Sequence, residues 1–338
     1  MPARNEAETI ARAVTSLVKQ EYPGEFRIVV VDDQSEDGTS DLAKAAATEA
    51  GVANRLEIMR AAALQSGWTG KLWALQQEIA SNQQDLPDYF WFTDADIVHA
   101  PDTLARLVSR AEQQHSDLVS LMVLLQVKSF PERLLTPPFL YYFLMLYPPK
   151  WTADNKAKTA GAAGGCILLR RSALERIGGL ATIRGEVIDD CALARAVKRS
   201  GGMIWMGLTR KSVSLRAYQT FGEIRDLIAR TAFTQLKYSP LLLLGTLAGM
   251  LLTYLAPVVL AFYPQPVVWR LSLAAWLLMA LTYLPTVRFY GLSPLWAPFL
   301  PVAAAFYSYA TWLSAVRYWL GRGGQWKGRA QAARATRS

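Results

Sequence analysis

The stretch FRIVVVDDQSEDGTSDLAKAAATEA, residues 26–50, decides the fold class because it holds a strand, a turn and a helix in immediate succession. The β-branched run from Ile28 to Val31 is short and wholly apolar, which is typical of a strand buried in a parallel sheet. Asp32 and Asp33 follow it directly, and then come the turn residues QSEDGTS and an alanine-rich helix. These residues predict a βα unit whose strand ends in two carboxylates.

The same alternation continues along the chain. RLEIMR, YFWFTD and DLVSLMVLLQV are predicted strands, and GKLWALQQEIASN and PDTLARLVSRAEQQ are predicted helices. Strands that alternate with helices predict an α/β fold with a mostly parallel sheet and helices on both faces. The first helix begins near Glu6 without a strand before it. We expect either that the first strand lies upstream of Met1 or that the sheet lacks it.

A second kind of composition begins near residue 238. The 32 residues from Tyr238 to Trp269 carry no charge, whereas a transmembrane helix needs roughly 20 mostly apolar residues. Three segments meet this requirement, at 241–262, 267–287 and 295–318. The second is the weakest because Arg270 and Arg288 bracket it.

The chain therefore divides into a soluble region over residues 1–237, a membrane region over 238–319 and a basic tail over 320–338. Arginine and lysine are dense on both sides of the membrane region, and such residues mark cytoplasmic flanks. Three full spans would put the two flanks on opposite sides, so the number of spans stays open. Next to a membrane region, the basic tail is expected to bind anionic lipid rather than nucleic acid.

Two further segments could contact a membrane surface. LLTPPFLYYFLMLYPPKW, residues 134–151, is too short to span a bilayer and fits either an interfacial or re-entrant element or an ordinary buried helix. FGEIRDLIARTAFTQL, residues 221–236, places apolar side chains at near-helical spacing. This spacing predicts an interfacial amphipathic helix, with a plain surface helix as the alternative.

Paired acids follow the aromatic strand YFWFTD. Asp94 and Asp96 are separated by one residue, so on an extended backbone their side chains point the same way. Two such carboxylates can converge on a hard cation, for which oxygen ligands suit Mg²⁺ or Mn²⁺. His99 could complete the site as a third ligand. The alternatives are that the acids only end the strand and that His99 is a partly solvated side chain.

Two other acidic clusters lie next to predicted elements. Asp32 and Asp33 could accept hydrogen bonds from a nucleobase or ribose at the strand end, or they could simply form the turn. Glu186, Asp189 and Asp190 precede the helix DDCALARAVKRSGG. One of them can be its N-cap, and a second acid is available as a general base.

Six motifs in order carry a family resemblance: PARNEAETI, VVVDDQSEDGT, GKLWAL, FTDAD, GAAGGCILLRRSALERIGGL and DDCALARAV. Together they resemble family 2 glycosyltransferases of the GT-A fold, over the chain from Pro2 to about Lys237. DDCALARAVKRSGG with ARTAFTQLKYSP looks like the hopene-associated glycosyltransferase subgroup, which is found beside hopanoid lipid biosynthesis in bacteria. The GT-A fold is thus the fold that the resemblance implies.

The resemblance also implies a role for each matching residue. The donor-binding residues would be Pro2, Arg4, Glu6, Asp32, Asp33, Lys71 and Asp94. Asp94 and Asp96 match the pair that meets the ribose and the metal on the diphosphate, and His99 could be a third ligand of the kind found in other GT-A enzymes. Asp190 matches the general base, with Asp189 in the place of the family's glutamate, and Gly164 and Gly165 match the turn that approaches donor sugar and acceptor.

Two positions depart from the family pattern. The arginine often found six residues after the base is replaced by Ala196, and IARTAFTQLKYS lacks the tryptophan of the Gln-x-x-Arg-Trp signature. The missing tryptophan argues against a processive synthase and favours a single-transfer enzyme.

The resemblance implies an inverting, single displacement in which Asp190 takes a proton from an acceptor hydroxyl while Mg²⁺ or Mn²⁺ offsets charge on the departing diphosphate. The expected donor is a UDP-sugar, and the expected acceptor is a lipid such as a hopanoid, because soluble transferases need no apolar segments. A multi-pass protein of the cell inner membrane with a cytoplasmic catalytic domain follows. The alternatives are transfer to polyprenyl phosphate and a catalytically inactive membrane scaffold.

Overall fold

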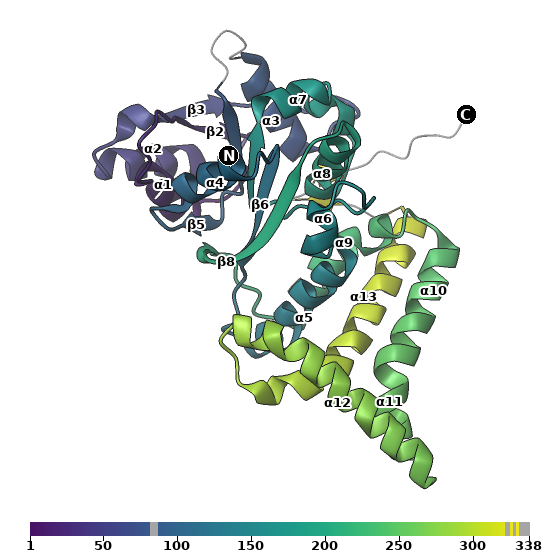
Figure 1. Cartoon of the computed structure of the whole chain (residues 1–338). Coiled ribbons are helices and arrows are strands. Elements are labelled where there is room, and N and C mark those ends of the chain that lie inside the picture. Colours follow the sequence, from purple (N-terminus) through teal and green to yellow (C-terminus); the bar gives the residue numbers. More distant parts are fainter. Residues whose placement is uncertain (82–86, 322–324, 327–328, 331–338) are drawn as a thin grey trace. The chain divides into compact units, whose positions relative to one another are not determined.

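The computed structural model describes residues 1–81, 87–321, 325–326 and 329–330 (Figure 1). The chain forms two compact units. Among the described residues, the sheet unit comprises 1–81, 87–125, 147–216, 326 and 329–330, and the helical unit comprises 126–146, 217–321 and 325. Most of the predicted basic tail, 320–338, lies outside the described residues.

A three-stranded parallel sheet forms the first part of the sheet unit, in the order β1-β2-β3. Its strands are β1 (Pro2–Ala3), β2 (Ile28–Asp32) and β3 (Leu56–Arg60). The apolar run of β2 is buried as its composition predicts except at Val29, which is partly buried, while Val30 and Val31 are 0% and 1% exposed. The prediction that no strand precedes the first helix is wrong, because Pro2 pairs with Val31 in a two-residue strand too short to show an apolar pattern.

A five-stranded mixed sheet forms the second part, in the order β4-β7-β6-β8-β5. Its strands are β4 (Tyr89–Thr93), β5 (Ile97–His99), β6 (Leu118–Leu124), β7 (Cys166–Arg170) and β8 (Ile204–Ser214). Only the β6–β8 pair is parallel, whereas β7 runs antiparallel to both of its neighbours and β5 runs antiparallel to β8. This sheet is therefore less parallel than predicted, because the chain returns through β7 in the reverse direction after residues 126–146.

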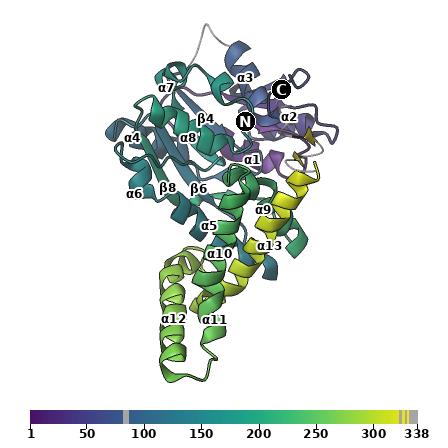
Figure 2. The same ribbon diagram turned by 90° about the vertical axis from the view of Figure 1, so that its right-hand side faces the viewer.

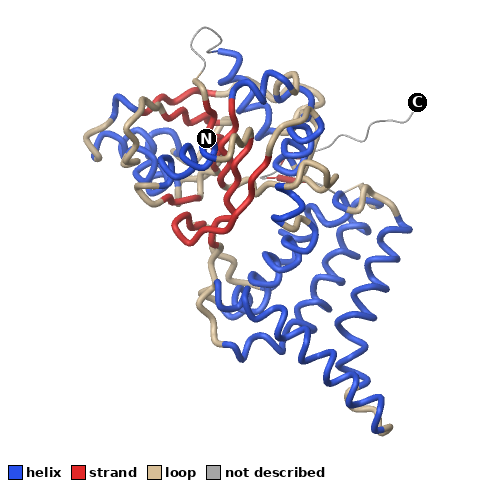
Figure 3. The backbone as a smooth tube through the Cα atoms, in the orientation of Figure 1, coloured by secondary structure: helices blue, strands red, loops and turns tan. Residues whose placement is uncertain are grey.

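Helices cover both faces of the five-stranded sheet (Figure 3). Successive side chains of a strand point to opposite faces. Accordingly, Leu168 of β7 packs in one cluster with Leu107 of helix α4 (Thr103–Gln113), and its neighbour Leu169 packs in another cluster with Leu193 of helix α8 (Asp189–Arg199). The helices of the sheet unit are α1 (Ile10–Val18), α2 (Thr39–Glu49), η1 (Ala53–Arg55), α3 (Gly70–Ser81), α4 (Thr103–Gln113), α6 (Pro149–Ala153), α7 (Arg171–Arg176), η2 (Leu180–Ile183) and α8 (Asp189–Arg199). The predicted α/β fold is confirmed.

The helical unit contains three segments that are long and apolar enough to cross a membrane, at Pro240–Leu260, Pro266–Phe289 and Pro294–Trp319 (Figure 2). Two of them bury only 11% of their most apolar window within the protein, and the third buries 44%. More than half of each of these windows is therefore not buried within the protein. The elements of this unit are α5 (Phe130–Leu146), α9 (Phe221–Gln235), α10 (Pro240–Met250), a π-helix η3 (Leu251–Leu255), α11 (Ala256–Leu260), α12 (Pro266–Phe289), η4 (Pro294–Phe299) and α13 (Leu300–Trp319). The two-residue strands β9 (Gln325–Trp326) and β10 (Arg329–Ala330) pair with each other.

The two segments predicted to contact a membrane surface are both helices that pack within the helical unit. α5 buries Leu135 in the same cluster as Ile228 of α9 and Tyr307 of α13, so a packed helix describes it better than a re-entrant element. Thr220 and Glu223 form a capping box that starts α9. Because α9 packs on α13, the boundary between the units lies before α9, at residue 217, rather than at residue 237.

Candidate active site

Asp190 lies in the first turn of α8, where a carboxylate is stabilised by the positive end of the helix dipole. Its Oδ2 accepts a hydrogen bond from the Gly164 amide at 2.8 Å, and its Oδ1 accepts one from the Cys191 amide at 2.7 Å. Desolvation and the neighbouring charge of Asp189 nevertheless raise the pKa of Asp190 to about 6. A carboxylate with this pKa is ionised at neutral pH and is a stronger base than an ordinary aspartate.

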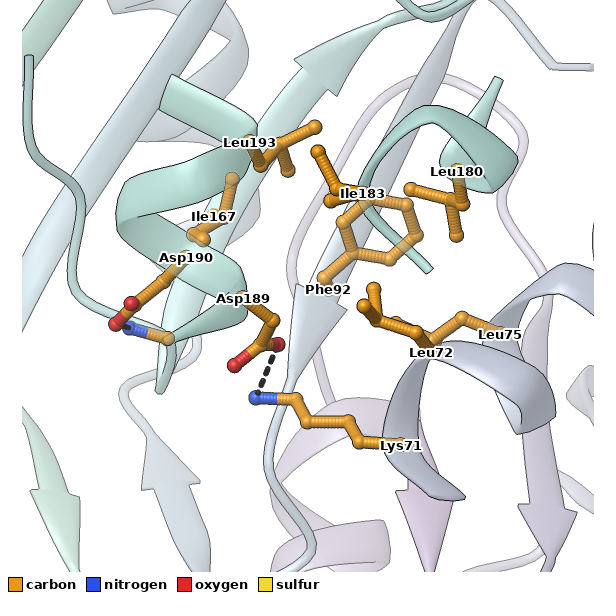
Figure 4. A pocket seen from close by; sticks show the side chains of 11 residues that line it. Lys71, Leu72, Leu75, Phe92, Ile167, Leu180, Ile183, Asp189, Asp190 and Leu193 are labelled. Carbon is orange, nitrogen blue, oxygen red and sulfur yellow. Dashed lines mark hydrogen bonds and ion pairs between the residues drawn. The ribbon is translucent and has the colours of Figure 1, made fainter. Parts of the chain in front are cut away.

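Lys71, at the start of α3, connects two acidic segments. Its Nζ lies 2.8 Å from Oδ1 of Asp94 and 3.3 Å from Oδ2 of Asp189, and Figure 4 shows it pointing at Asp189. Burial by itself would lower the pKa of Lys71, but Asp189 and Asp94 outweigh it and raise the pKa well above its usual value. Lys71 is therefore a permanent positive charge between the loop after β4 and the N-terminus of α8.

A side chain at Gly164 would press on two charged groups of the site. A Cβ atom on Gly164 would lie 3.2 Å from both Oδ2 of Asp190 and Nζ of Lys71. The absence of a side chain lets the backbone amide of Gly164 reach Asp190 directly. Gly165 instead packs against Val123 and Ile97 and accepts a hydrogen bond from Thr93 through its carbonyl, so Gly165 supports the site rather than lining it.

Apolar side chains close one side of the pocket that contains these groups (Figure 4). Its polar lining consists of Lys71, Asp189, Asp190 and the backbone of Gly164. The apolar lining residues are Leu72, Leu75, Phe92, Ile167, Leu180, Ile183 and Leu193. A wall of this kind lowers the local dielectric and strengthens the electrostatic interactions of the charged groups beside it.

Asp96 is held by an arginine that the sequence did not predict. Nε of Arg216 lies 2.9 Å from Oδ2 of Asp96, and its Nη2 lies 3.1 Å from Oε1 of Glu6. The register of β5 against β8 explains the first contact, because Ile97 pairs with Ser214 and the Leu215 amide donates to the Asp96 carbonyl at 2.7 Å. Arg216 follows directly. In the sequence, Arg216 is simply a basic residue two positions after a strand, a pattern too common to indicate a site.

The acids at the end of β2 have different surroundings. Asp32 accepts hydrogen bonds from the Ser35 amide at 2.9 Å and from the Ser40 hydroxyl, so both of its oxygens stabilise the turn after β2, as the structural alternative predicts. Asp33 is buried beside Arg4, which lies 3.9 Å from its Oδ2 and donates to its carbonyl. Arg4, Glu6 and Pro2 thus lie at the same edge of the sheet as Asp33.

His99 does not support the predicted role as a metal ligand. Its ring is buried, with Nε2 2.8 Å from the Thr93 hydroxyl and Nδ1 2.9 Å from the Ser212 hydroxyl. Desolvation lowers its pKa to about 3, so the imidazole is neutral. Both ring nitrogens are engaged between strands, and neither is available for a cation.

Asp94 and Asp96 do not lie on the extended backbone that the sequence predicted, because residues 95 and 96 form a turn in which the Ile97 amide donates to the Asp94 carbonyl at 3.3 Å. Their side chains need not point the same way, but each could still offer a carboxylate oxygen to a divalent cation. One carboxylate oxygen of Asp94 is paired with Lys71, and one of Asp96 is paired with Arg216. Within the described residues, no hydrogen bond reaches the other oxygen of either carboxylate. No cluster of three or more histidine, cysteine, aspartate or glutamate side chains suited to a metal lies in the described part of the chain. Mg²⁺ commonly binds through one or two carboxylates and completes its coordination with water and substrate phosphates.

The structure thus brings most of the predicted residues into two groups and one separate pair. Lys71, Asp94, Asp189, Asp190 and Gly164 form one group through direct contacts. The second group consists of Glu6 and Asp96, linked by Arg216, while Arg4 and Asp33 form a separate pair. Asp32, His99 and Gly165 are structural in their contacts.

The chain matches the model of the family described as Glycosyl transferase family 2 over residues 1–178, just over half of its length. No curated protein matches the chain in sequence.

Solved structures resemble it at low identity. The mannosyltransferase PcManGT from Pyrobaculum calidifontis, in complex with GDP-Man and Mn²⁺, is 19% identical with a TM-score of 0.55, covering 95% of this chain and 86% of that one. TarS from S. aureus is 18% identical with a TM-score of 0.42, covering 69% and 38%. Glucosyl-3-phosphoglycerate synthase from Mycobacterium tuberculosis, in complex with Mg²⁺ and UDP, is 18% identical with a TM-score of 0.41, covering 69% and 76%. The likeness to PcManGT extends over nearly the whole chain and concerns the fold alone.

Proposed function

The chain belongs to glycosyl transferase family 2 and has its GT-A-like α/β fold, and from this premise we propose that it transfers a sugar from a UDP-sugar to a hydroxyl group of a membrane lipid. The observation that carries the proposal is the environment of Asp190. Its carboxylate is fixed by two backbone amides, has a pKa of about 6 and lies in a pocket beside Lys71 and Asp189. This is the environment that a general base for a hydroxyl acceptor requires.

The mechanism is a single displacement with inversion at the anomeric carbon. Asp190 accepts the proton of the acceptor hydroxyl, and the amides of Gly164 and Cys191 keep its oxygens oriented throughout. Lys71 places a positive charge next to the carboxylates of Asp94 and Asp189. Asp94 and Asp96 would hold Mg²⁺ or Mn²⁺, which supplies positive charge to the leaving diphosphate when it is bound.

The donor is bound at the strand ends. Asp33, Arg4 and Glu6 lie at the carboxyl edge of the three-stranded sheet, which is where open α/β sheets bind their ligands. We assign the nucleoside to this edge and the sugar to the space beside Gly164. The support for UDP as the carrier is the resemblance of VVVDDQSEDGT to the family, and a panel of nucleotide sugars tests it directly.

The acceptor is a lipid, and a hopanoid is the specific candidate. The support is that one chain carries both the catalytic fold and three helices whose apolar surface is mostly exposed. We therefore place the protein in the cell inner membrane as a multi-pass protein. Its catalytic region lies in the cytoplasm, and α9 lies at the membrane surface. An ionised polyprenyl phosphate would have little use for a base, so the pKa of Asp190 favours a hydroxyl acceptor.

The experiment uses the full chain in lipid nanodiscs with a panel of labelled nucleotide sugars and lipid acceptors that include hopanoid alcohols, sterols and polyprenyl phosphate. The expected result is labelled lipid from a UDP-sugar and a lipid alcohol in the presence of Mg²⁺ or Mn²⁺. Product from polyprenyl phosphate alone would replace the proposed acceptor. No transfer from any donor, in protein that UDP and Mn²⁺ do not stabilise thermally, would favour the inactive scaffold.

A further inference from the structure

Each carboxylate of the Asp94–Asp96 pair already has a positive partner from the chain. Lys71 holds Asp94 at 2.8 Å, and Arg216 holds Asp96 at 2.9 Å. Lys71 also forms an ion pair with Asp189, the first residue of α8, so it has a second role in holding that helix. Arg216 differs, because its second partner is Glu6, close to the start of the chain.

Arg216 is fixed in this position by the strands and not by a flexible loop alone. The Leu215 amide bonds to the Asp96 carbonyl, and the Arg216 amide donates to the Ser214 hydroxyl at 3.3 Å. The Asp96 and Glu6 side chains are only 13% and 12% exposed. A planar guanidinium that stays charged at every relevant pH can therefore bind both carboxylates at once.

A divalent cation and Arg216 cannot both have full use of Asp96. A cation that binds Asp96 must displace or share the guanidinium, and it then lies close to a like charge. A nucleotide diphosphate changes this balance, because its negative charges attract both the cation and the released guanidinium. Glu6 keeps Arg216 at the site during the exchange, since it contacts Nη2 and not Nε.

We propose that Arg216 is a positioning residue that occupies Asp96 in the nucleotide-free enzyme and gives it up to the divalent cation when the donor diphosphate arrives. The proposal rests on the proposed function in that the diphosphate belongs to the donor. It makes metal binding depend on the nucleotide, so that the free enzyme holds the cation weakly. Arg216 then compensates the charge of the diphosphate instead of that of Asp96.

The test measures Mn²⁺ binding by electron paramagnetic resonance, with the full chain in detergent and no nucleotide present. Arg216→Met is expected to bind Mn²⁺ about tenfold more tightly than wild type, the ratio that corresponds to one charge-assisted hydrogen bond. Arg106→Met is the matched control, because Arg106 on α4 is exposed and also pairs with an aspartate, Asp102. Its Mn²⁺ affinity should equal that of wild type.

The second arm repeats the titration with saturating UDP. UDP should tighten Mn²⁺ binding in wild type by a larger factor than in Arg216→Met, because binding couplings are reciprocal and the variant has lost the exchange. An unchanged or weaker Mn²⁺ affinity of nucleotide-free Arg216→Met would overturn the proposal, as would an equal UDP effect in both proteins. If UDP binds neither protein, the UDP assignment fails while the nucleotide-free arm still decides the role of Arg216.

Arg216→Lys provides a second variant in case the methionine variant does not fold. A lysine keeps the charge but cannot span Asp96 and Glu6 with a planar fork. Its Mn²⁺ affinity should lie between those of wild type and Arg216→Met, about threefold tighter than wild type for half of one such bond. If folded Arg216→Lys bound Mn²⁺ with the affinity of wild type, the two-pronged contact of the Arg216 guanidinium would not be what weakens cation binding at Asp96. That result would overturn the proposal.

Discussion

Asp190→Asn separates the catalytic role of this carboxylate from its effect on stability, because the substitution keeps the shape of the side chain and removes its charge. Transfer should fall by a factor of about 10² to 10⁴, the usual contribution of a general base. The stability of the variant relative to wild type should rise as the pH increases from about 4 to about 6. Asp190 is a carboxyl group whose pKa is raised from 3.8 to about 6 in the folded protein.

The sign follows from proton binding. Between pH 3.8 and 6 the folded protein holds a proton on Asp190 that the unfolded chain has lost, so wild type loses stability as pH rises through this window and does not regain it. The full shift corresponds to about 3 kcal/mol, and solvent at this partly exposed carboxylate reduces it to about 1–2 kcal/mol. The asparagine variant lacks this loss. It should therefore gain about 1–2 kcal/mol relative to wild type between pH 4 and pH 8.

One hydrogen bond works against the variant at every pH. The Gly164 and Cys191 amides both donate to Asp190, whereas an asparagine offers a single acceptor oxygen. The loss costs about 1 kcal/mol and shifts the whole stability curve without changing its dependence on pH. The diagnostic quantity is thus the change in the stability difference with pH, and not its value at one pH.

The assay combines transfer activity with thermal unfolding of the full chain in detergent at pH 4 and pH 8. Asp88→Asn is the control, because it makes the same substitution at a side chain that is 88% exposed. Near wild-type activity in Asp190→Asn would refute the base assignment. A stability difference that stays constant or falls as pH rises would refute the electrostatic account of its pKa.

Three further predictions concern neighbouring residues. Gly164→Ala should lower kcat at least tenfold with little change in unfolding temperature, because its Cβ would lie 3.2 Å from both Asp190 and Lys71. Steady-state kinetics and thermal unfolding measure the two quantities, and an unchanged kcat would contradict the prediction. Lys71→Met should weaken UDP binding and raise the pKa of Asp190 further, because a positive charge that favours the ionised form of Asp190 is lost. Calorimetry measures UDP binding, and the acid limb of the pH–rate profile reports the pKa. An acid limb that stays in place or moves to lower pH would contradict the prediction. His99→Leu should cost about 1–3 kcal/mol of stability, because the hydroxyls of Thr93 and Ser212 lose their hydrogen-bond partner. The substitution should leave the Mn²⁺ affinity unchanged. A large loss of Mn²⁺ affinity in folded protein would instead show that His99 is a metal ligand.

The sequence predicts the parts of this site that depend on local patterns. The run before Asp32 and Asp33 identifies a buried strand, and the acids ahead of the α8 helix identify its first turn; both are where the pattern places them. Asp94 also directly follows its strand, β4, as the pattern places it. Local periodicity and the carboxyl-end rule suffice for these residues because each is fixed by the element that carries it.

The parts that the sequence does not predict depend on contacts between distant segments. Arg216 reaches Asp96 only through the register of β5 against β8, and this pairing joins residues more than a hundred positions apart. β1 is two residues long and has no periodicity to detect. His99 is three residues from Asp96, yet its ring is engaged with Thr93 and Ser212, so proximity in sequence gave the wrong expectation for its side chain.

The configuration of the product tests the central claim most directly. The labelled lipid formed from an α-linked UDP-sugar would be isolated from the nanodisc reaction, and the coupling constant of its anomeric proton would be measured by nuclear magnetic resonance. A single displacement with Asp190 as base predicts a β-linked product from wild type and almost none from Asp190→Asn. An α-linked product, or an undiminished yield from the variant, would contradict it.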